Sequence, residues 1–147
     1  MNAVKVATVF THRRPAETAP AVQRLIQIAA ETGAVLRFDS GETRKHGLQP
    51  VDGLELDARV QRNVDVCFAL GGDGTILNAL RTYAGTGVPV FGVNYGEIGF
   101  LATIDREDVE TGIRRAFQGD FEILSLPGIE ISGPGQTRLA INDVSLH

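Results

Sequence analysis

The first part of the chain alternates between apolar runs typical of strands and apolar positions repeated at helical spacing. Residues 4–10 alternate in polarity and are rich in β-branched side chains, which predicts a strand. Residues 17–32 place apolar side chains along one face of a helix, and Gly33 is suited to end it. Because residues 34–38 form a second apolar run, we expect a β-α-β unit with a right-handed crossover.

The pattern changes before the central strand. Residues 39–53 are polar and rich in glycine, which predicts a loop, and residues 54–62 are expected to hold a short helix. Residues 64–70 are apolar apart from one early charge, and they predict a buried strand that ends in glycines. A helix is then expected over residues 75–83.

The alternation continues for one more round. Residues 88–93 predict a strand, and a helix capped by Asp105 or Asp108 is expected to reach Phe117 and to end before Gly119. Strands that alternate with helices in this way indicate an α/β fold. We therefore predict a mainly parallel sheet with helices on both faces.

The last part of the chain has a different pattern. Residues 121–126, 128–132 and 137–147 predict strands with no helix between them. We therefore expect an α/β nucleotide-binding unit over residues 1–120, followed over residues 121–147 by strands that begin or support an all-β domain. The final strand has no polar tail, so the chain is expected to be cut within a larger protein. An ordinary strand at a sheet edge is the alternative.

Composition excludes several functional classes. With 147 residues, 43% hydrophobic and 22% charged, the chain can bury a globular core. The formal net charge of -4 argues against broad nucleic-acid binding. No apolar run approaches the ~20 residues that span a bilayer, so no membrane association is expected. The lone Cys67 lies in an apolar strand, which favours buried packing over reactivity and suits the reducing cytoplasm.

A glycine-rich turn follows the central strand and opens a helix. Its sequence is Gly71-Gly72-Asp73-Gly74-Thr75. Glycines let the backbone approach an anion, and the N–H groups of a helix's first turn point at it, so the turn predicts a phosphate site. It lacks the Lys-Ser/Thr pair of a P-loop and the spacing of a dinucleotide fingerprint.

Asp73 is the unusual residue of this turn, because a carboxylate repels phosphate unless it binds a metal or takes a proton. Two functional interpretations are a general base for a hydroxyl and a Mg²⁺ ligand. The structural alternative is a turn aspartate that accepts backbone N–H bonds and caps the helix. We expect Thr75 to be a cap rather than a catalyst.

Further candidate residues follow the next strand and end the chain. The loop at residues 94–101 should face the glycine turn across a cleft at the same sheet edge. Asn94 suits a tight turn, and Phe100 suits either the core or the wall of a pocket for a ring. Asn142 and Asp143 alternate across a strand, so one of them needs an inward partner unless the strand lies at an edge.

The histidines give no sign of a metal centre. His12 and His46 are interpreted as surface loop residues. They share no ligand spacing with each other, with His147 or with Cys67, so no zinc site is predicted.

Three motifs, in order along the chain, resemble those of the NAD kinases. They are residues 71–75, residues 92–101 (GVNYGEIGFL) and residues 140–147 (AINDVSLH). The first alone is weakly specific, because diacylglycerol and sphingosine kinases and phosphofructokinases carry similar turns. The second is more specific, and the Pro-x-Gly-Thr-x-Asn pattern of the lipid kinases is absent. The Thr-His-Arg-Arg-Pro turn at residues 11–15 also fits the family.

The resemblance implies a Rossmann-like or phosphofructokinase-like fold and a specific reaction. ATP would donate its γ-phosphoryl group to the 2′-hydroxyl of the adenosine ribose of NAD, giving NADP. Asp73 resembles the general base, and Mg²⁺ is expected mainly on the donor phosphates, with no protein-held metal site. The nucleotide-binding and NAD-binding residues that the resemblance implies are Gly71, Gly72, Gly74, Thr75, Asn94, Phe100, Asn142 and Asp143.

The chain departs from the family in two respects. The family has a second, all-β domain with further dinucleotide contacts and most of the oligomer interface, and this chain stops where that domain begins. We therefore expect residues 1–147 alone to bind nucleotide weakly and to phosphorylate NAD slowly or not at all, and the full-length protein to be a homo-oligomer. Asp143 stands where Glu is common. A lipid kinase and a non-catalytic nucleotide-binding module are the alternative functions.

Overall fold

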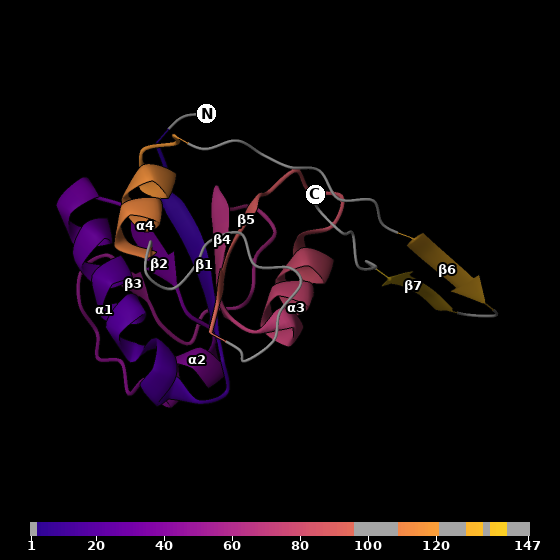
Figure 1. The fold of residues 1–147 in the computed structure, drawn as a ribbon, viewed down its shortest axis with the longest axis horizontal. Helices are drawn as coiled ribbons and strands as arrows, with labels where there is room; N and C mark the ends of the chain where they lie inside the picture. Colours follow the sequence, from indigo (N-terminus) through magenta and orange to yellow (C-terminus); the bar gives the residue numbers. More distant parts are fainter. Residues whose placement is uncertain (1–2, 96–108, 121–128, 134–135, 141–147) are drawn as a thin grey trace.

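The main element of the fold is a five-stranded parallel sheet (Figure 1). The computed structural model describes residues 3–95, 109–120, 129–133 and 136–140. Every neighbouring pair in the sheet is parallel, and the strand order is β3-β2-β1-β4-β5. This confirms the predicted α/β fold. The strands are β1 (Val6–Thr11), β2 (Val35–Arg37), β3 (Leu54–Glu55), β4 (Val66–Gly71) and β5 (Val90–Asn94).

Helices cover both faces of the sheet, as the alternating pattern predicted. Helices α1 (Pro15–Thr32) and α4 (Val109–Phe117) lie side by side on one face, and α3 (Asp73–Tyr83) covers the other (Figure 1). The short helix α2 (Ser40–Lys45) lies at the end where the strands finish. Since α1 ends at Gly33, whose φ of 77° favours glycine, the predicted stop is confirmed.

Strand β4 is buried along its whole length and divides the core into two layers. Val66, Phe68 and Leu70 belong to the cluster beneath α1 and α4, where the Phe68 ring stacks on Phe117 at a centroid distance of 5.2 Å. Cys67 belongs to the cluster beneath α3 and is fully buried, as predicted. Successive side chains of a strand point to opposite faces, so a strand covered on both sides is apolar throughout.

The early charge in the central apolar run has a structural role. Asp65 Oδ2 accepts hydrogen bonds from the backbone N–H groups of Lys5 and Val6, at 2.8 and 2.9 Å. These bonds join the starts of β1 and β4 at the edge of the sheet opposite to α2. The carboxylate therefore fixes the alignment of the two central strands.

Two predicted elements before the central strand were wrong. The predicted loop at residues 39–53 contains α2, whose N-cap Asp39 accepts a hydrogen bond from the Glu42 N–H at 2.8 Å. The predicted helix at residues 54–62 is instead β3, followed by irregular chain. Strand β3 exists because it pairs with β2, and a two-residue strand leaves no periodic pattern in a sequence.

A separate two-stranded sheet follows the α/β unit. Strands β6 (Ile129–Gly133) and β7 (Gln136–Ala140) are antiparallel, and their ribbon lies apart from the five-stranded sheet (Figure 1). They match the strands predicted from residue 128 and from residue 137. The strand predicted at residues 121–126 lies outside the described residues, as does the end of the last one, and the proposed boundary at residue 120 stays a prediction.

Candidate functional site

The strand order reverses between β1 and β4. From β1 the chain moves outward to β2 and β3, and it then returns to place β4 on the other side of β1. In open parallel sheets, the carboxyl ends beside such a reversal form the ligand-binding crevice. Residues 12–14 leave the sheet after β1 and residues 72–75 leave it after β4. The His12 N–H donates to the Leu70 carbonyl oxygen at 2.7 Å, so the two segments start side by side.

The glycine-rich turn joins β4 directly to α3. Gly72 is the N-cap, with φ of -90° and ψ of -166°, and it contributes no side chain to cap the helix. The first N–H groups of a helix have no partner within it, and together with the helix dipole they favour an anion. The turn therefore has the backbone geometry of a phosphate site.

Thr75 is packed against Gly71 and does not cap the helix. A Cβ at Gly71 would lie 2.7 Å from the Cβ of Thr75, closer than real contacts allow. The prediction that Thr75 caps α3 was wrong, because the helix begins two residues earlier and Gly72 takes the N-cap position. Gly74, by contrast, has open space where its Cβ would be.

Asp73 is the first residue of α3 and is half-buried at the carboxyl edge of the sheet. Its position after the Gly72 N-cap argues against the interpretation of Asp73 as the capping residue itself. A carboxylate in the first turn of a helix is stabilised by the helix dipole. The structure therefore keeps a negative group at the mouth of a backbone site suited to phosphate.

The end of β5 adjoins the glycine turn. Asn94 is the register partner of Gly71, and the Tyr95 N–H donates to the Gly71 carbonyl oxygen at 2.8 Å. Strand β5 also approaches α3 closely, because a Cβ at Gly92 would lie 3.2 Å from Cδ1 of Ile76. The two glycine-containing strand ends therefore meet at one edge, as their apolar runs predicted.

A polar cluster that the sequence did not reveal lies at the end of β1. Its centre is Thr11, which donates from its N–H to Glu42 Oε1 at 3.0 Å and from its hydroxyl to Glu42 Oε2 at 2.5 Å. Lys45 Nζ donates to the Thr11 carbonyl oxygen at 3.1 Å and to Glu42 Oε1 at 2.9 Å. All the polar groups of the last residue of β1 are thus bound by side chains of α2.

His46 completes this cluster. Its Nε2 lies 2.9 Å from the Thr11 hydroxyl oxygen. Because the hydrogen of that hydroxyl goes to Glu42, His46 Nε2 is assigned as the donor of this bond. Burial by itself raises the pKa of Glu42, but the neighbouring His46, with Nε2 at 3.6 Å from Glu42 Oε2, and the hydrogen bonds from Thr11 and Lys45 outweigh it and hold that pKa below its ordinary value.

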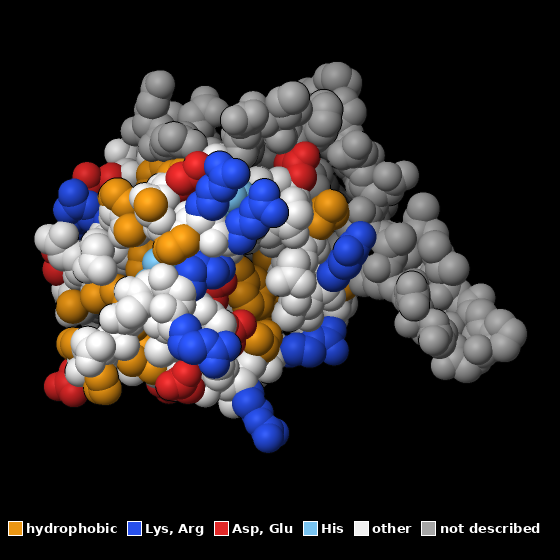
Figure 2. Space-filling view, turned by 90° about the horizontal axis from the view of Figure 1, so that it is seen from below, with side chains coloured by type: hydrophobic (Ala, Val, Ile, Leu, Met, Phe, Trp, Pro, Cys, Tyr) orange, Lys and Arg blue, Asp and Glu red, His pale blue; other side chains and the backbone are white. Residues whose placement is uncertain are grey.

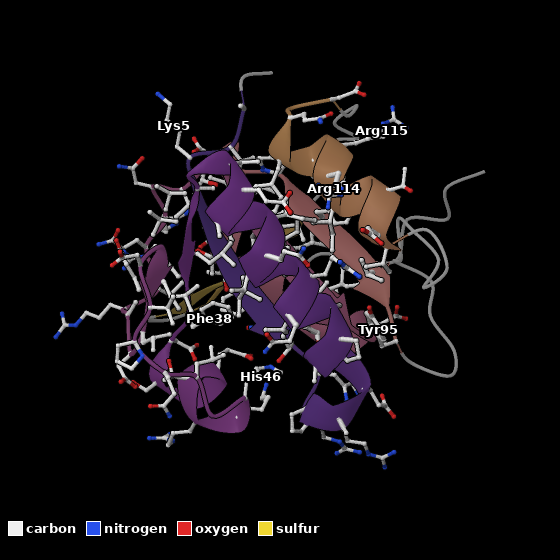
Figure 3. The ribbon with its side chains drawn as sticks, turned by 90° about the vertical axis from the view of Figure 1, so that its left-hand side faces the viewer. Lys5, Phe38, His46, Tyr95, Arg114 and Arg115 are labelled. Carbon is white, nitrogen blue, oxygen red and sulfur yellow. The ribbon has the colours of Figure 1, made fainter. Side chains whose placement is uncertain are left out.

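The interpretation of His46 as a surface loop residue was wrong. Its side chain is only 4% exposed, and it forms the C-cap of α2 (Figure 3). The sequence does contain one usable signal, since Asp39 followed three residues later by Glu42 is typical of a helix N-terminus. No local pattern indicates the contact with Thr11, which lies 31 residues before Glu42.

Several predicted site residues lie outside the described part of the chain. These are Phe100, Asn142 and Asp143. For Asn94 the structure gives the backbone position alone. Within the described residues, the predicted residues that come together are those of the turn at 71–75 and the backbone of Asn94.

The described residues contain neither a metal-binding cluster nor a membrane-spanning helix. Among residues 3–95, 109–120, 129–133 and 136–140, no group of three or more His, Cys, Asp or Glu side chains is arranged to hold a metal ion. Within the same ranges, no helix has the length and apolar character needed to cross a membrane.

Comparison with known proteins identifies a family for the segment that contains the site. The model of the ATP-NAD kinase N-terminal domain matches residues 22–121. An NAD kinase of Clostridium botulinum (strain Loch Maree / Type A3) is 38% identical over 99 residues, which are 65% of this chain and 35% of the relative. An NAD kinase of Bifidobacterium longum subsp. infantis is 32% identical over 147 residues, covering 95% of this chain and 41% of the relative.

A solved structure shares the fold. The crystal structure of yeast NADH kinase complexed with NADH superposes with a TM-score of 0.76 and 16% sequence identity. The match covers 97% of this chain and 48% of the yeast chain. The chain therefore spans less than half the length of these relatives.

Proposed function

The chain belongs to the NAD kinase family, and we propose that its protein transfers the γ-phosphoryl group of ATP to the 2′-hydroxyl of the adenosine ribose of NAD, giving NADP. The observation that carries this proposal is the position of the glycine turn. Residues 71–75 lie at the carboxyl edge beside the reversal of strand order, inside the segment that the family model matches. A carboxylate at the mouth of an anion site suits phosphorylation of a hydroxyl.

Asp73 is the proposed general base. It would take the proton of the 2′-hydroxyl as that oxygen forms its bond to the γ-phosphorus and the bond to the leaving ADP oxygen breaks. Phosphoryl transfer needs little covalent help from a protein, so positioning, charge neutralisation and one proton acceptor account for most of the requirement. The half-buried carboxylate at the start of α3 supplies the acceptor.

The glycine backbone is the proposed phosphate cradle. Gly71, Gly72 and Gly74, with Thr75, would let a phosphate group approach the N–H groups at the start of α3. Open space at the Cβ position of Gly74 supports this role. The close packing of Gly71 against Thr75 supports a different one, which is to bring α3 tightly onto the end of β4.

Mg²⁺ fits this arrangement as a partner of the substrate. Such ions usually keep several water ligands and bind through substrate phosphates rather than in a cage made by the protein, so Asp73 is not required as a metal ligand and can act as the proton acceptor. When bound, the ion would neutralise charge on the phosphates of ATP. The residues themselves would bind the phosphate chain and hold the proton acceptor.

The remaining parts of the proposal concern the whole protein. Asn94 and Phe100 are proposed to contact the nucleotide, and Asn142 with Asp143 to hold the dinucleotide. The two units at residues 1–120 and 121–147, a homo-oligomeric state and a cytoplasmic location are also proposed. Because the matches cover only 35% and 41% of these relatives, we propose that residues 1–147 alone phosphorylate NAD slowly or not at all. The comparisons do not favour a lipid kinase.

The direct test is NADP formation by the purified full-length protein from NAD, ATP and Mg²⁺. We expect NADP to accumulate in proportion to time and enzyme, with one ADP released for each NADP. A reaction without ATP controls for contaminating NADP. ATP hydrolysis without NADP, or phosphorylation of a diacylglycerol in its place, would contradict the proposal.

A further inference from the structure

The glycine turn lacks a positive charge. Residues 71–75 contribute one carboxylate and no Lys or Arg, yet both proposed substrates carry a chain of negatively charged phosphates. In phosphoryl transfer such charge is neutralised by metal ions and by fixed cations of the protein. Figure 2 looks onto the carboxyl edge of the sheet and shows several Lys and Arg side chains gathered over it.

The segment after β1 carries two arginines beside the glycine turn. His12 extends the pairing of β1 with β4 by donating to the Leu70 carbonyl oxygen at 2.7 Å. Residues 13 and 14 therefore leave the sheet directly beside Gly71 and Gly72, on the other side of the reversal in strand order. Arg13 and Arg14 are both exposed. Their backbone lies at the edge of the sheet where a parallel sheet of this order binds its ligand.

The partners of these cations single out Arg13. Arg14 Nη1 lies 4.0 Å from Glu17 Oε1, so Glu17 offsets part of the Arg14 charge. Within the described ranges, the Arg13 side chain makes no hydrogen bond and no ion pair. Lys45 of α2, which contacts the end of β1, is already bound to Thr11 and Glu42. Of the two arginines on this segment, Arg13 is therefore the one whose charge is not offset by a carboxylate of the described residues.

The segment is held in place from both ends. On one side, the cluster formed by Glu42, Lys45 and His46 binds every polar group of Thr11, the residue before His12. On the other side, Arg14 is the N-cap of α1 and Pro15 is its first residue. A cation on a short segment fixed at both ends loses less conformational freedom on binding than one on a free loop.

We propose that Arg13, with a smaller contribution from Arg14, binds the phosphate chain of a nucleotide that occupies the crevice between the ends of β1 and β4. Arg presents several donors in a planar fork that matches phosphate oxygens. This inference rests on the proposed function and assigns the fixed cation that the glycine turn lacks. This phosphate chain belongs either to ATP or to NAD. The two cases differ in which substrate loses affinity when Arg13 is replaced.

The test compares Arg13→Gln and Arg14→Gln with Lys5→Gln in the full-length protein. Lys5 is an exposed cation just before β1, at the opposite end of the sheet (Figure 3), so its substitution changes net charge equally without touching the crevice. The readouts are the dissociation constants of ATP, NAD and adenosine by calorimetry, and the KM values for ATP and NAD. Thermal unfolding is followed in parallel to show that the variants fold.

We expect Arg13→Gln to raise the dissociation constant of ATP or of NAD about tenfold, which corresponds to ~1.4 kcal/mol. Adenosine, which has no phosphate, should bind unchanged, and Lys5→Gln should behave as wild type. A loss of affinity confined to ATP places the phosphates of ATP at Arg13. A loss of affinity confined to NAD places the phosphates of NAD there. Unchanged affinities for both, or an equal loss for adenosine, would overturn the inference. The wild-type protein is assayed beside the variants. If it forms no NADP, the proposed function is overturned, whereas unchanged affinities in an active protein overturn only the role of Arg13.

Discussion

Gly71 and Gly74 lie three residues apart in one turn, but their surroundings differ. A Cβ at Gly71 would meet the β-branched Thr75 at 2.7 Å, whereas Gly74 has open space. Gly71→Ala is therefore expected to lower the free energy of unfolding by about 1–3 kcal/mol, the usual cost of overpacking. Gly74→Ala is expected to leave it unchanged or to raise it by up to about 1 kcal/mol, because alanine favours helix. Urea denaturation of both variants checks this prediction.

The same pair of variants separates folding from binding. If Gly74 lies under a bound phosphate, Gly74→Ala should reduce nucleotide affinity while the protein remains as stable as wild type. Equal stability losses in the two variants would contradict the packing described for the turn.

Cys67 gives a second prediction at the scale of one residue. Its side chain is fully buried beneath α3, and burial raises the pKa of the thiol. The thiolate is the reactive form, so the folded protein should react with a chromogenic disulfide reagent at least about a hundred times more slowly than the protein unfolded in guanidinium. A rapid reaction under native conditions would show that β4 is accessible and that the two-layer core is wrong.

Whether a residue's role could be predicted from the sequence depends on how far along the chain its partner lies. The roles of Cys67 and the glycine turn follow from neighbours within a few positions, so a local pattern reveals them. The structural roles of Glu42 and His46 depend on their contacts with Thr11, which lies more than 30 residues earlier in the chain. A polar, glycine-containing stretch carries no sign of such a partner, which is why His46 was placed on the surface.

At the scale of elements, α2 is attached to β1 mainly by an ionised carboxylate. The Glu42 pKa is lowered in the folded protein, so ionised Glu42 stabilises the fold above its unfolded-state pKa of about 4.5. That contribution is lost as the pH falls through the lower, folded-state pKa. We expect Glu42→Gln to lower the free energy of unfolding by about 2 kcal/mol at pH 7, because it disturbs charge-assisted bonds.

The difference between wild type and Glu42→Gln should shrink as the pH falls below about 4.5, since protonated Glu42 resembles glutamine in charge. Urea denaturation at a series of pH values measures it. Glu31→Gln is the control, because Glu31 forms an exposed ion pair with Arg114, a kind of pair that contributes about 0–1 kcal/mol. A Glu42→Gln penalty that stays constant from pH 7 to pH 3 would contradict the assigned charge.

Elements were predictable where a periodic run was long. Helix α1 and strand β4 carry clear patterns and were placed to within about two residues. Strand β3 has two residues and exists through its pairing with β2, so its sequence alone suggested a helix. The start of α3 was misplaced by two residues, and this small shift decided that Gly72, not Thr75, is the N-cap.

At the scale of the whole molecule, the order of the strands decides where chemistry can occur. The sequence predicted a parallel sheet covered on both faces, but it could not predict that β4 returns beside β1. That single topological fact places the segment with Arg13 next to the turn with Asp73. It also explains how residues about 60 positions apart form one candidate site.

The rate of NADP formation by Asp73→Asn in the full-length protein is a direct test of the proposed general base. Asparagine keeps the size of the side chain and removes the proton acceptor. Asp52→Asn is the control, because Asp52 is exposed between α2 and β3. If Asp73 is the general base, kcat should fall by about a hundredfold or more, with unfolding temperature and nucleotide affinity close to wild type. An Asp73→Asn protein that forms NADP at a rate near wild type would contradict the account.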